Sequence, residues 1–248
     1  MTKTMLQTSA ITVCLTLCAL VSQAQTPTKA QQDIWWTPDL TLPSLAHVPE
    51  ALSTPVTIGG KSIQVTLVNG SVKRTVHTCT DYLNAVAQTL APMDDKGGDT
   101  AFVERCYPLQ YLNAAQPATE SFVGPTWGND ALQHLPPFDI FVEASLAAKA
   151  DRARARGESW HNFDPTMKVV SISDRKLIIE NETVRWSFDL VALADVNHDG
   201  LNDAVVIACD SKKTTGGGLC IPMVLTASAP NAVYRLVNSS SPPYALKH

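Results

Sequence analysis

The sequence lacks an excess of basic residues: 19 Lys and Arg stand against 23 Asp and Glu, and the formal net charge is −4. Nucleic-acid binding requires basic side chains that neutralise phosphates, so this balance excludes a nucleic-acid-binding protein. The chain also lacks the bias of disordered or collagen-like sequences, because 45% of its residues are hydrophobic and 17% are charged. Composition therefore predicts an ordinary globular protein and indicates no reaction.

Short catalytic signatures are absent as well. No Gly-x-Ser-x-Gly or His-Glu-x-x-His string occurs, so two common hydrolase motifs are missing. Ser159, His161 and Asp164 lie close together in the sequence, but near neighbours in a chain seldom face one another as a catalytic triad. A secreted or periplasmic hydrolase with an unrecognised active site is therefore the alternative to a non-catalytic protein.

The first 24 residues have the features of a secretory signal peptide. Lys3 precedes an apolar run over residues 10–21 that is too short to span a bilayer, and Ser22-Gln23-Ala24 places small residues at a cleavage site after Ala24. These features predict an exported protein, periplasmic or secreted, and a retained membrane anchor is the alternative. No later stretch reaches about 20 apolar residues, so we expect no membrane span in the mature form.

Four of the six cysteines follow the signal peptide, and an even number in an exported chain predicts two disulfides. Four cysteines allow three pairings. We favour Cys79–Cys106 and Cys209–Cys220, because each pair brackets one local unit of the chain. No Cys-x-x-Cys string occurs, which argues against a redox motif or a zinc ribbon. A free catalytic cysteine is the alternative.

Residue patterning divides the mature chain into an arm and one domain. Residues 25–55 are rich in Thr, Pro, Gln and Ser without clear periodicity, so we expect an extended arm. Alternating residues around Gly59-Gly60 and Asn69-Gly70 predict β-hairpins within residues 56–76. Residues 77–157 change to helical spacing.

Three helices are expected in this helical segment, and strands follow it. The first helix includes Tyr82 to Leu90, the second begins at Asp99 and is broken or kinked by Pro108, and the third runs from Phe138 to Arg156. Residues 167–238 predict strands over Lys168–Ile172, Lys176–Glu180, Thr183–Leu193, Asp203–Cys209, Cys220–Thr226 and Val233–Val237.

Together these segments predict an α+β fold, with antiparallel sheets from the N- and C-terminal segments and a central helical segment stapled by a disulfide. The expected division is a signal peptide at 1–24, an arm at 25–55 and a single globular domain at 56–248. One antiparallel sheet that includes both β segments is one hypothesis for their arrangement.

Residues 195–203 carry oxygen-bearing side chains at the spacing of a calcium loop. Loop positions 1, 3, 5 and 9 are Asp195, Asn197, Asp199 and Asp203, position 6 is Gly200, and Leu201 at position 7 offers its backbone carbonyl. Such a set can surround one Ca²⁺ with about six or seven oxygens. Three carboxylates so close together repel one another unless a cation is bound. The pattern therefore predicts a Ca²⁺ site, and an Asx-rich turn without an ion is the alternative.

The loop differs from an EF-hand, because position 12 is Val206 rather than Glu and because residues 204–208 predict a buried strand. The order of a strand, the loop Asp-x-Asn-x-Asp-Gly-x-x-Asp and a second strand is similar to the calcium loops of FG-GAP or VCBS-type repeats. Such repeats occur in integrin-like propellers. The resemblance covers residues 186–225. The loop is also similar to single-copy loops of exported bacterial proteins, including periplasmic i-type lysozyme inhibitors and effector-immunity proteins. A propeller requires several repeats, so the single loop implies a calcium site without a propeller.

These features predict an exported, non-catalytic, calcium-stabilised module that binds another protein, and the resemblance implies an inhibitor or immunity protein. The loop between Cys209 and Cys220 adjoins the predicted ion site and is a candidate partner-binding surface. His198, at loop position 4, is expected to face solvent. A glycan-binding module is a further alternative, and its candidate aromatic residues are Trp35, Trp36, Trp127 and Trp160.

Overall fold

The computed structural model describes residues 28–29, 33–34, 42–93, 99–138, 144–213 and 220–237. The predicted signal peptide, Trp35, Trp36 and residues 214–219 of the loop between the last two cysteines lie outside the described residues. No helix in the described ranges is long and apolar enough to cross a membrane. Helices occur together with antiparallel sheets, so the predicted α+β class is confirmed.

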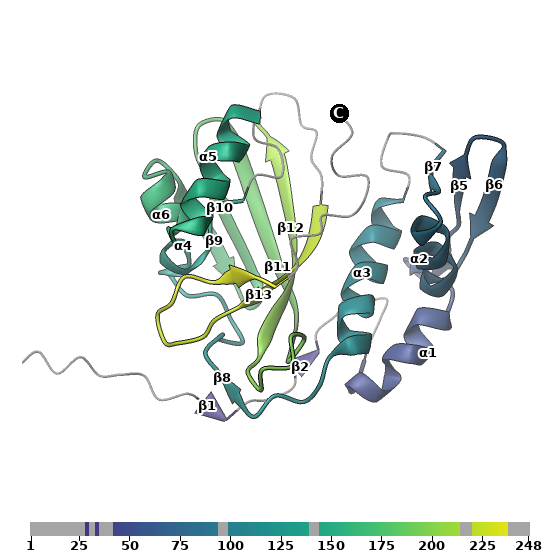
Figure 1. Cartoon of the computed structure of the whole chain (residues 1–248), viewed down its shortest axis with the longest axis horizontal. Helices are drawn as coiled ribbons and strands as arrows, with labels where there is room; N and C mark the ends of the chain where they lie inside the picture. The colour runs from purple at the N-terminus through teal and green to yellow at the C-terminus, as the bar shows by residue number, and fades with distance from the viewer. Residues whose placement is uncertain are drawn as a thin grey trace, which may run out of the picture.

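An antiparallel sheet of C-terminal strands forms the centre of the molecule (Figure 1). In sheet order its strands are β14 (Arg235–Leu236), β13 (Cys220–Thr226), β12 (Asp203–Lys212), β11 (Val184–Ala194), β10 (Lys176–Glu180) and β9 (Lys168–Ser173). Each strand lies within or overlaps its predicted range, and strands adjacent in sequence are adjacent in the sheet. β2 (Asp33–Ile34) pairs with Ala192 and Leu193 of β11, so part of the arm is fixed to the sheet.

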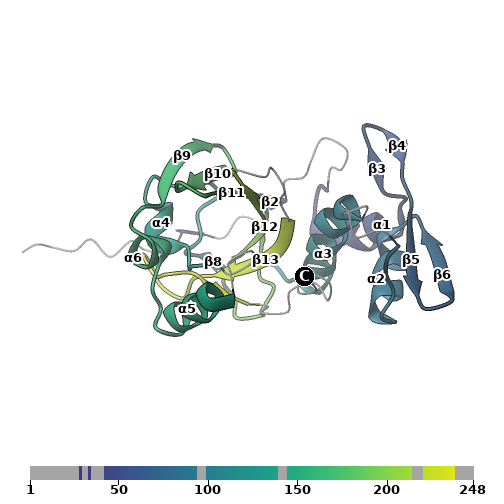
Figure 2. The ribbon, with the colours of Figure 1, turned by 90° about the horizontal axis from the view of Figure 1, so that it is seen from above.

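Both faces of this sheet are covered along β11 and β12 (Figure 1, Figure 2). On one face Val191, Val205 and Ile207 belong to a core shared with α3 (Thr100–Ala114). On the other face Phe188 and Val206 belong to a second core, which is covered by α4 (Ala131–His134), α5 (Ala144–Ala155) and α6 (Trp160–Phe163). Strands buried on both faces have continuous apolar sequences, which explains residues 190–194 and 204–208.

The segments before the sheet form a helical lobe, defined here as the described residues from 42 to 114. Its elements are η1 (Leu45–His47), α1 (Val48–Ser53), α2 (Cys79–Ala87), α3, and the strands β3 (Thr57–Ile58), β4 (Lys61–Ser62), β5 (Val65–Asn69), β6 (Val72–Val76) and β7 (Ala91–Pro92). β3 and β4 form one hairpin, and β5 lies between β6 and β7 in a second sheet. The hypothesis of one common sheet is therefore wrong, because α3 lies between these strands and the central sheet (Figure 2).

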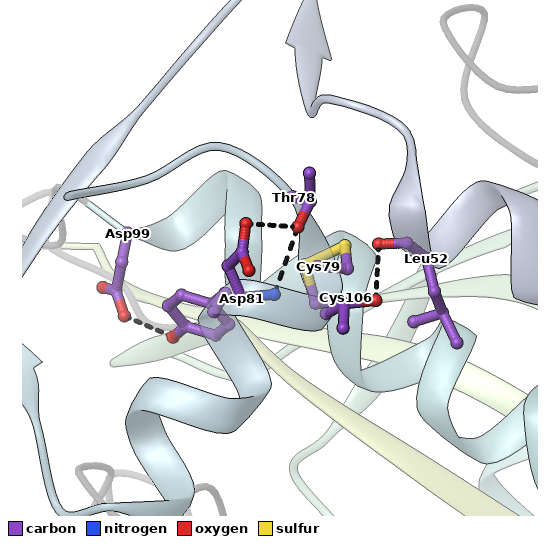
Figure 3. The surroundings of a disulfide bond; sticks show 8 residues. Leu52, Thr78, Cys79, Asp81, Asp99 and Cys106 are labelled. Carbon is purple, nitrogen blue, oxygen red and sulfur yellow. Dashed lines mark hydrogen bonds between the residues drawn. A yellow bond between two sulfur atoms is a disulfide. The ribbon is translucent and has the colours of Figure 1, made fainter. Parts of the chain in front are cut away.

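The start of α2 is stabilised by its capping residue and by a disulfide (Figure 3). The Thr78 hydroxyl accepts a hydrogen bond from the Asp81 amide at 3.1 Å and donates one to the Asp81 carboxylate at 2.9 Å. The Thr78 hydroxyl thus satisfies a backbone amide that has no partner within the helix, and the negative charge of Asp81 interacts favourably with the dipole at the helix N-terminus. Cys79, the first residue of α2, is bonded to Cys106 of α3, and Cys209 is bonded to Cys220. These are the pairs that the sequence analysis favours.

Pro108 lies inside α3, and the helix continues to Ala114, so the predicted break at this proline is wrong. Proline removes one backbone hydrogen bond and costs about 3 kcal/mol in a helix interior. Pro108 and Leu109 are both buried, and the packing of α3 between the central sheet and the rest of the helical lobe offsets this cost. Asp99 precedes α3, but its side chain makes no capping bond and accepts the Tyr82 hydroxyl at 2.6 Å instead (Figure 3).

Two further boundaries differ from the prediction. The third helix is described from Ala144, whereas Phe138 is non-helical and packs against Trp160 and Trp186 in the second core. Residues 139–143 lie outside the described residues. The expected arm contains α1, which the sequence does not predict because six residues are too few to show a helical period.

Replacement of both Cys79 and Cys106 by alanine is expected to lower the free energy of unfolding. The bond closes a loop of 27 residues in the unfolded chain, which corresponds to about 3–4 kcal/mol in the chain-entropy model. Urea-induced unfolding of the variant and the wild type under oxidising conditions measures the difference. A loss below about 1 kcal/mol would show that the bond constrains the unfolded chain much less than this model requires.

Candidate functional site

The candidate calcium site connects β11 to β12, and its residues 195–203 are here called the aspartate loop. Its first and last residues adjoin central strands, so Asp195 and Asp203 have only 3% and 0% of their surface exposed. Asn197 and Asp199 are exposed. Two of the four predicted side-chain ligands are therefore buried and two are exposed, and all four belong to one tight turn.

Side-chain oxygens of the aspartate loop accept hydrogen bonds from its own backbone. The Asp195 carboxylate accepts from the amides of Asp199 and Gly200 at 3.1 and 2.9 Å. Asp199 Oδ1 accepts from the Leu201 amide at 2.8 Å. Gly200 has φ +87°, a left-handed conformation that glycine adopts without strain. The sharp turn predicted at loop position 6 is thus present.

Asp203 has one carboxylate oxygen that has no partner at full hydrogen-bond geometry among the described residues. Its Oδ2 accepts from the amides of Val196 and Asn197 at 2.8 and 3.1 Å. The Thr226 hydroxyl is near enough to oppose the effect of burial on the pKa of this carboxyl, but the buried Oδ1 has no partner at hydrogen-bond geometry. Burial raises the pKa of this carboxyl, against the opposing effects of the Thr226 hydroxyl and the two amides, and the charge of Asp199 raises it further. A cation beside Oδ1 would supply the missing compensation for the ionised form.

The donors of the aspartate loop fit a hard cation by type. Carboxylate, amide and carbonyl oxygens are the ligands of Ca²⁺, and the Leu201 carbonyl accepts no hydrogen bond from the described residues. Among the described residues, one cluster of three Asp, Glu, His or Cys side chains has its possible ligand atoms within 4.8 Å of one another. That cluster is Glu104, Cys209 and Cys220. The three aspartates of the loop do not converge in this way. Support for an ion therefore comes from donor type and from unpaired oxygens, not from a closed cage of carboxylates.

The aspartate loop also binds the segment that leaves α3, residues 114–120, here called the linking segment. The backbone bonds are Gln116 N to Asp195 O at 2.8 Å, Asp195 N to Gln116 O at 3.1 Å, Thr119 N to Gly200 O at 2.9 Å and Asn202 N to Glu120 O at 2.9 Å. The exposed His198 lies with its Nε2 at 2.7 Å from the Ala114 carbonyl. This carbonyl is one of those left without a helical partner at the end of α3. Sequence reasoning missed these contacts, because they join residues about 80 positions apart.

A cleft of about 580 Å³ lies between α3, the start of the β3–β4 hairpin and strands β10 to β12. Glu104 of α3 is half-buried there and makes no hydrogen bond or ion pair with the described residues. Burial raises the pKa of the Glu104 carboxyl, the negative charge of Asp189 raises it further, and Lys176 opposes both effects. Lys176 is paired with Asp189 at 2.9 Å. The cleft is built from several separate segments, so no motif in the sequence signals it.

Other residues considered from the sequence serve the fold. The Asp164 carboxylate accepts hydrogen bonds from Thr166 and Asn181, and Ser159 is buried, so Ser159, His161 and Asp164 form no triad in the described structure. Trp127 and Trp160 have 8% and 3% of their surface exposed. A glycan-binding surface on either of these two tryptophans is therefore ruled out.

Comparisons of this chain with family models, with curated proteins and with solved structures find no match. The resemblance to FG-GAP or VCBS-type loops and to lysozyme inhibitors consequently stays a prediction that depends on the residues of the aspartate loop and its two strands.

Substitution of Gly200 by alanine is expected to destabilise the protein through backbone strain alone. A methyl group at this position would meet only Thr119 Oγ1, at an ordinary 3.7 Å, whereas a left-handed conformation costs a residue with Cβ about 1–2 kcal/mol. The melting temperature should fall by roughly 2–8 °C. Gly200→Asn is the control, because asparagine tolerates this conformation better than alanine. Equal melting temperatures for wild type and Gly200→Ala would contradict the turn described.

Proposed function

We propose that this protein is an exported, non-catalytic module that is stabilised by calcium and binds another protein. The aspartate loop carries the proposal. Its residue Asp203 has a buried carboxylate oxygen with no partner at hydrogen-bond geometry in the described structure, and the other oxygens of the loop are of the type that Ca²⁺ prefers as ligands. Asp195, Asn197, Asp199, the Leu201 carbonyl and Asp203 would hold the ion. The two disulfides support export, since such bonds form and persist in oxidising compartments.

The position of the aspartate loop supports a structural role for the ion. No residue of the loop is among those that line the cleft, so an ion in the loop would lie outside that cleft. It would neutralise carboxylates that repel one another and would fix the turn between two central strands. Through the linking segment it would also hold the end of α3. We infer that calcium stabilises the connection between the two lobes.

The helical lobe offers features suited to a protein partner. Ile58, Val72 and Met93 are large hydrophobic residues with 54%, 54% and 61% of their surface exposed. β6 is an edge strand, and Val76 is its one buried residue. An exposed edge can accept a strand of another protein. The positive charges of Lys73 and Arg74 on this strand favour a partner with acidic side chains.

An inhibitor or immunity protein would use these features without chemistry of its own. Such a protein acts by occupying a surface of an exported enzyme, which requires a rigid framework and an exposed docking side. The calcium-bound loop and the disulfides would supply rigidity, and the hairpins of the helical lobe would supply the docking side. This is the class of protein that the sequence resemblance implies.

Calcium is expected to raise the melting temperature of the metal-free protein. At a concentration 100 times the Kd the gain is about 2.7 kcal/mol, which corresponds to roughly 5–11 °C at this size. Asp199→Asn keeps the shape of the side chain but removes a charge, so it should reduce the calcium-induced shift. Scanning fluorimetry with EDTA and then with excess Ca²⁺ measures this shift separately from any intrinsic destabilisation.

Glu182→Gln is the matched control, because Glu182 is an exposed carboxylate outside the aspartate loop. Asp210 is less suitable, since it is buried with 5% of its surface exposed and its loss would destabilise the protein directly. The control should keep the full calcium-induced shift. If Ca²⁺ moves the wild-type melting temperature no more than it moves that of Asp199→Asn, and calorimetry detects no binding heat, the aspartate loop is an Asx-rich turn without an ion.

A photo-reactive amino acid at Val72 is expected to form a discrete cross-link with the partner in the compartment to which the protein is exported. The same group at Glu182, which is exposed in the turn between β10 and β11 of the central sheet, should not form it. Excess unlabelled protein should compete the product away, and mass spectrometry of the product identifies the partner. Identical products from both positions, or a product that competition leaves unchanged, would count against docking through the edge of β6.

A further inference from the structure

Glu104 lies beside the disulfide between Cys209 and Cys220. A carboxylate oxygen of Glu104 and the two Sγ atoms all lie within 4.8 Å of one another. All three residues are half-buried, and both Glu104 and Cys209 line the cleft between α3 and the sheet. A molecule that enters the cleft therefore meets the disulfide together with a carboxyl group that has no hydrogen bond to the described residues.

The two disulfides of the protein differ in position. Cys79 and Cys106 have 0% of their surface exposed and lie in the core of the helical lobe. Cys209 and Cys220 form the terminal pair of the β12–β13 ladder, and residues 204–208 are paired with residues 221–225 by backbone contacts of their own. Reduction of the second disulfide would thus leave the sheet intact, whereas reduction of the first requires the core to open.

We propose that Cys209–Cys220 is a thiol–disulfide exchange site, at which Glu104 donates a proton to the departing sulfur and a dithiol is the reductant. This inference is independent of calcium and of the protein partner. Exchange proceeds by attack of a thiolate on one sulfur, and the second sulfur leaves more easily when it is protonated. Cys209 lines the cleft, so its Sγ is the atom attacked.

The exchange balances in two steps. A thiolate of the dithiol forms a bond to Cys209 Sγ, the Cys209–Cys220 bond breaks, and the Cys220 sulfur takes the electron pair together with the proton of Glu104. The second thiol of the reagent, as its thiolate, then attacks the reagent sulfur in the mixed disulfide, and Cys209 leaves and takes a proton from solvent. Glu104 also regains its proton from solvent. The protein gains two electrons and two protons, and the dithiol is oxidised to a disulfide.

Charges around Glu104 determine how this donor responds to pH. The charged groups that line the cleft with it are Arg105 of the same helix, Asp174, Arg175 and Lys176 beside the β9–β10 turn, and Asp189 of β11. Burial and Asp189 raise the pKa of the Glu104 carboxyl, and Lys176 opposes them. A raised pKa keeps the proton on Glu104 to higher pH. Once ionised, the same carboxylate repels an incoming thiolate, so the wild-type rate per thiolate should fall as pH rises.

The test uses dithiothreitol on the folded, oxidised protein, with rates divided by the thiolate concentration at each pH between about 5 and 8. Alkylation and peptide mapping follow the two disulfides separately. We expect Cys209–Cys220 to be reduced first, while Cys79–Cys106 stays oxidised. At the acidic end Glu104→Gln should slow this reduction about tenfold, which is below the full effect of enzymatic general acids. At the alkaline end Glu104→Gln should be as fast as the wild type or faster, because it lacks the repelling charge.

Glu50→Gln is the matched control, since Glu50 is exposed on α1 outside the cleft. It should reproduce the wild-type rates and their pH dependence, and circular dichroism should show that each protein stays folded. The crossing of the two rate profiles separates a proton donor from a residue that only packs beside the disulfide. The proposal is overturned if Glu104→Gln and the wild type have parallel profiles, or if both disulfides are reduced together in the folded protein.

Discussion

The hydrogen bonds between the aspartate loop and the linking segment are the constraint on which the arrangement of the two lobes depends. Asp195 directly follows β11, and both its amide and its carbonyl are paired with Gln116. A buried backbone group left unpaired costs about 1–3 kcal/mol, so the linking segment is bound to this place once the hairpin forms. The chain leaves α3 at this point, and the axis of that helix is thereby set against the face of the sheet.

The covered sheet explains why the chain has one lobe on each side of β11 and β12. Strands that are apolar on both faces must be packed against other elements on both faces. The helical lobe covers one face, and α4 to α6 cover the other. The helical lobe supplies α3 to one face, and its own disulfide holds α2 on α3 from the opposite side. Pro108 is tolerated in the middle of α3 because this double burial gives the helix no alternative position.

Sequence patterning predicts what is local in this molecule. Alternation locates the hairpins within residues 56–76, and apolar runs with turn residues between them locate the strands from β9 to β14. Cysteine spacing within local units favours the observed disulfides. Oxygen spacing identifies the aspartate loop, since its turn depends on nearby residues such as Asp195 and Gly200. Patterning does not reveal that Asp99 bonds to Tyr82 and makes no helix cap. It also does not reveal the contacts of the linking segment or the cleft around Glu104. Each of these depends on residues that only tertiary packing brings together, and local propensity carries no information about them.

Two positions on β12 would respond to different chemistry. Asp203 begins the strand in the aspartate loop, and Cys209 lies six residues later, about 20 Å away at the rise of an extended strand. Asp203 would respond to a divalent cation and Cys209 to a thiol. Perturbations separated by more than about 10 Å without shared partners are generally additive, so calcium should stabilise the reduced and the oxidised protein equally. A calcium-induced shift in melting temperature that changed on reduction of Cys209–Cys220 would mean that β12 transmits strain between Asp203 and Cys209. The ladder with β11, which is paired on both sides of the irregularity between Leu190 and Ala192, opposes such transmission.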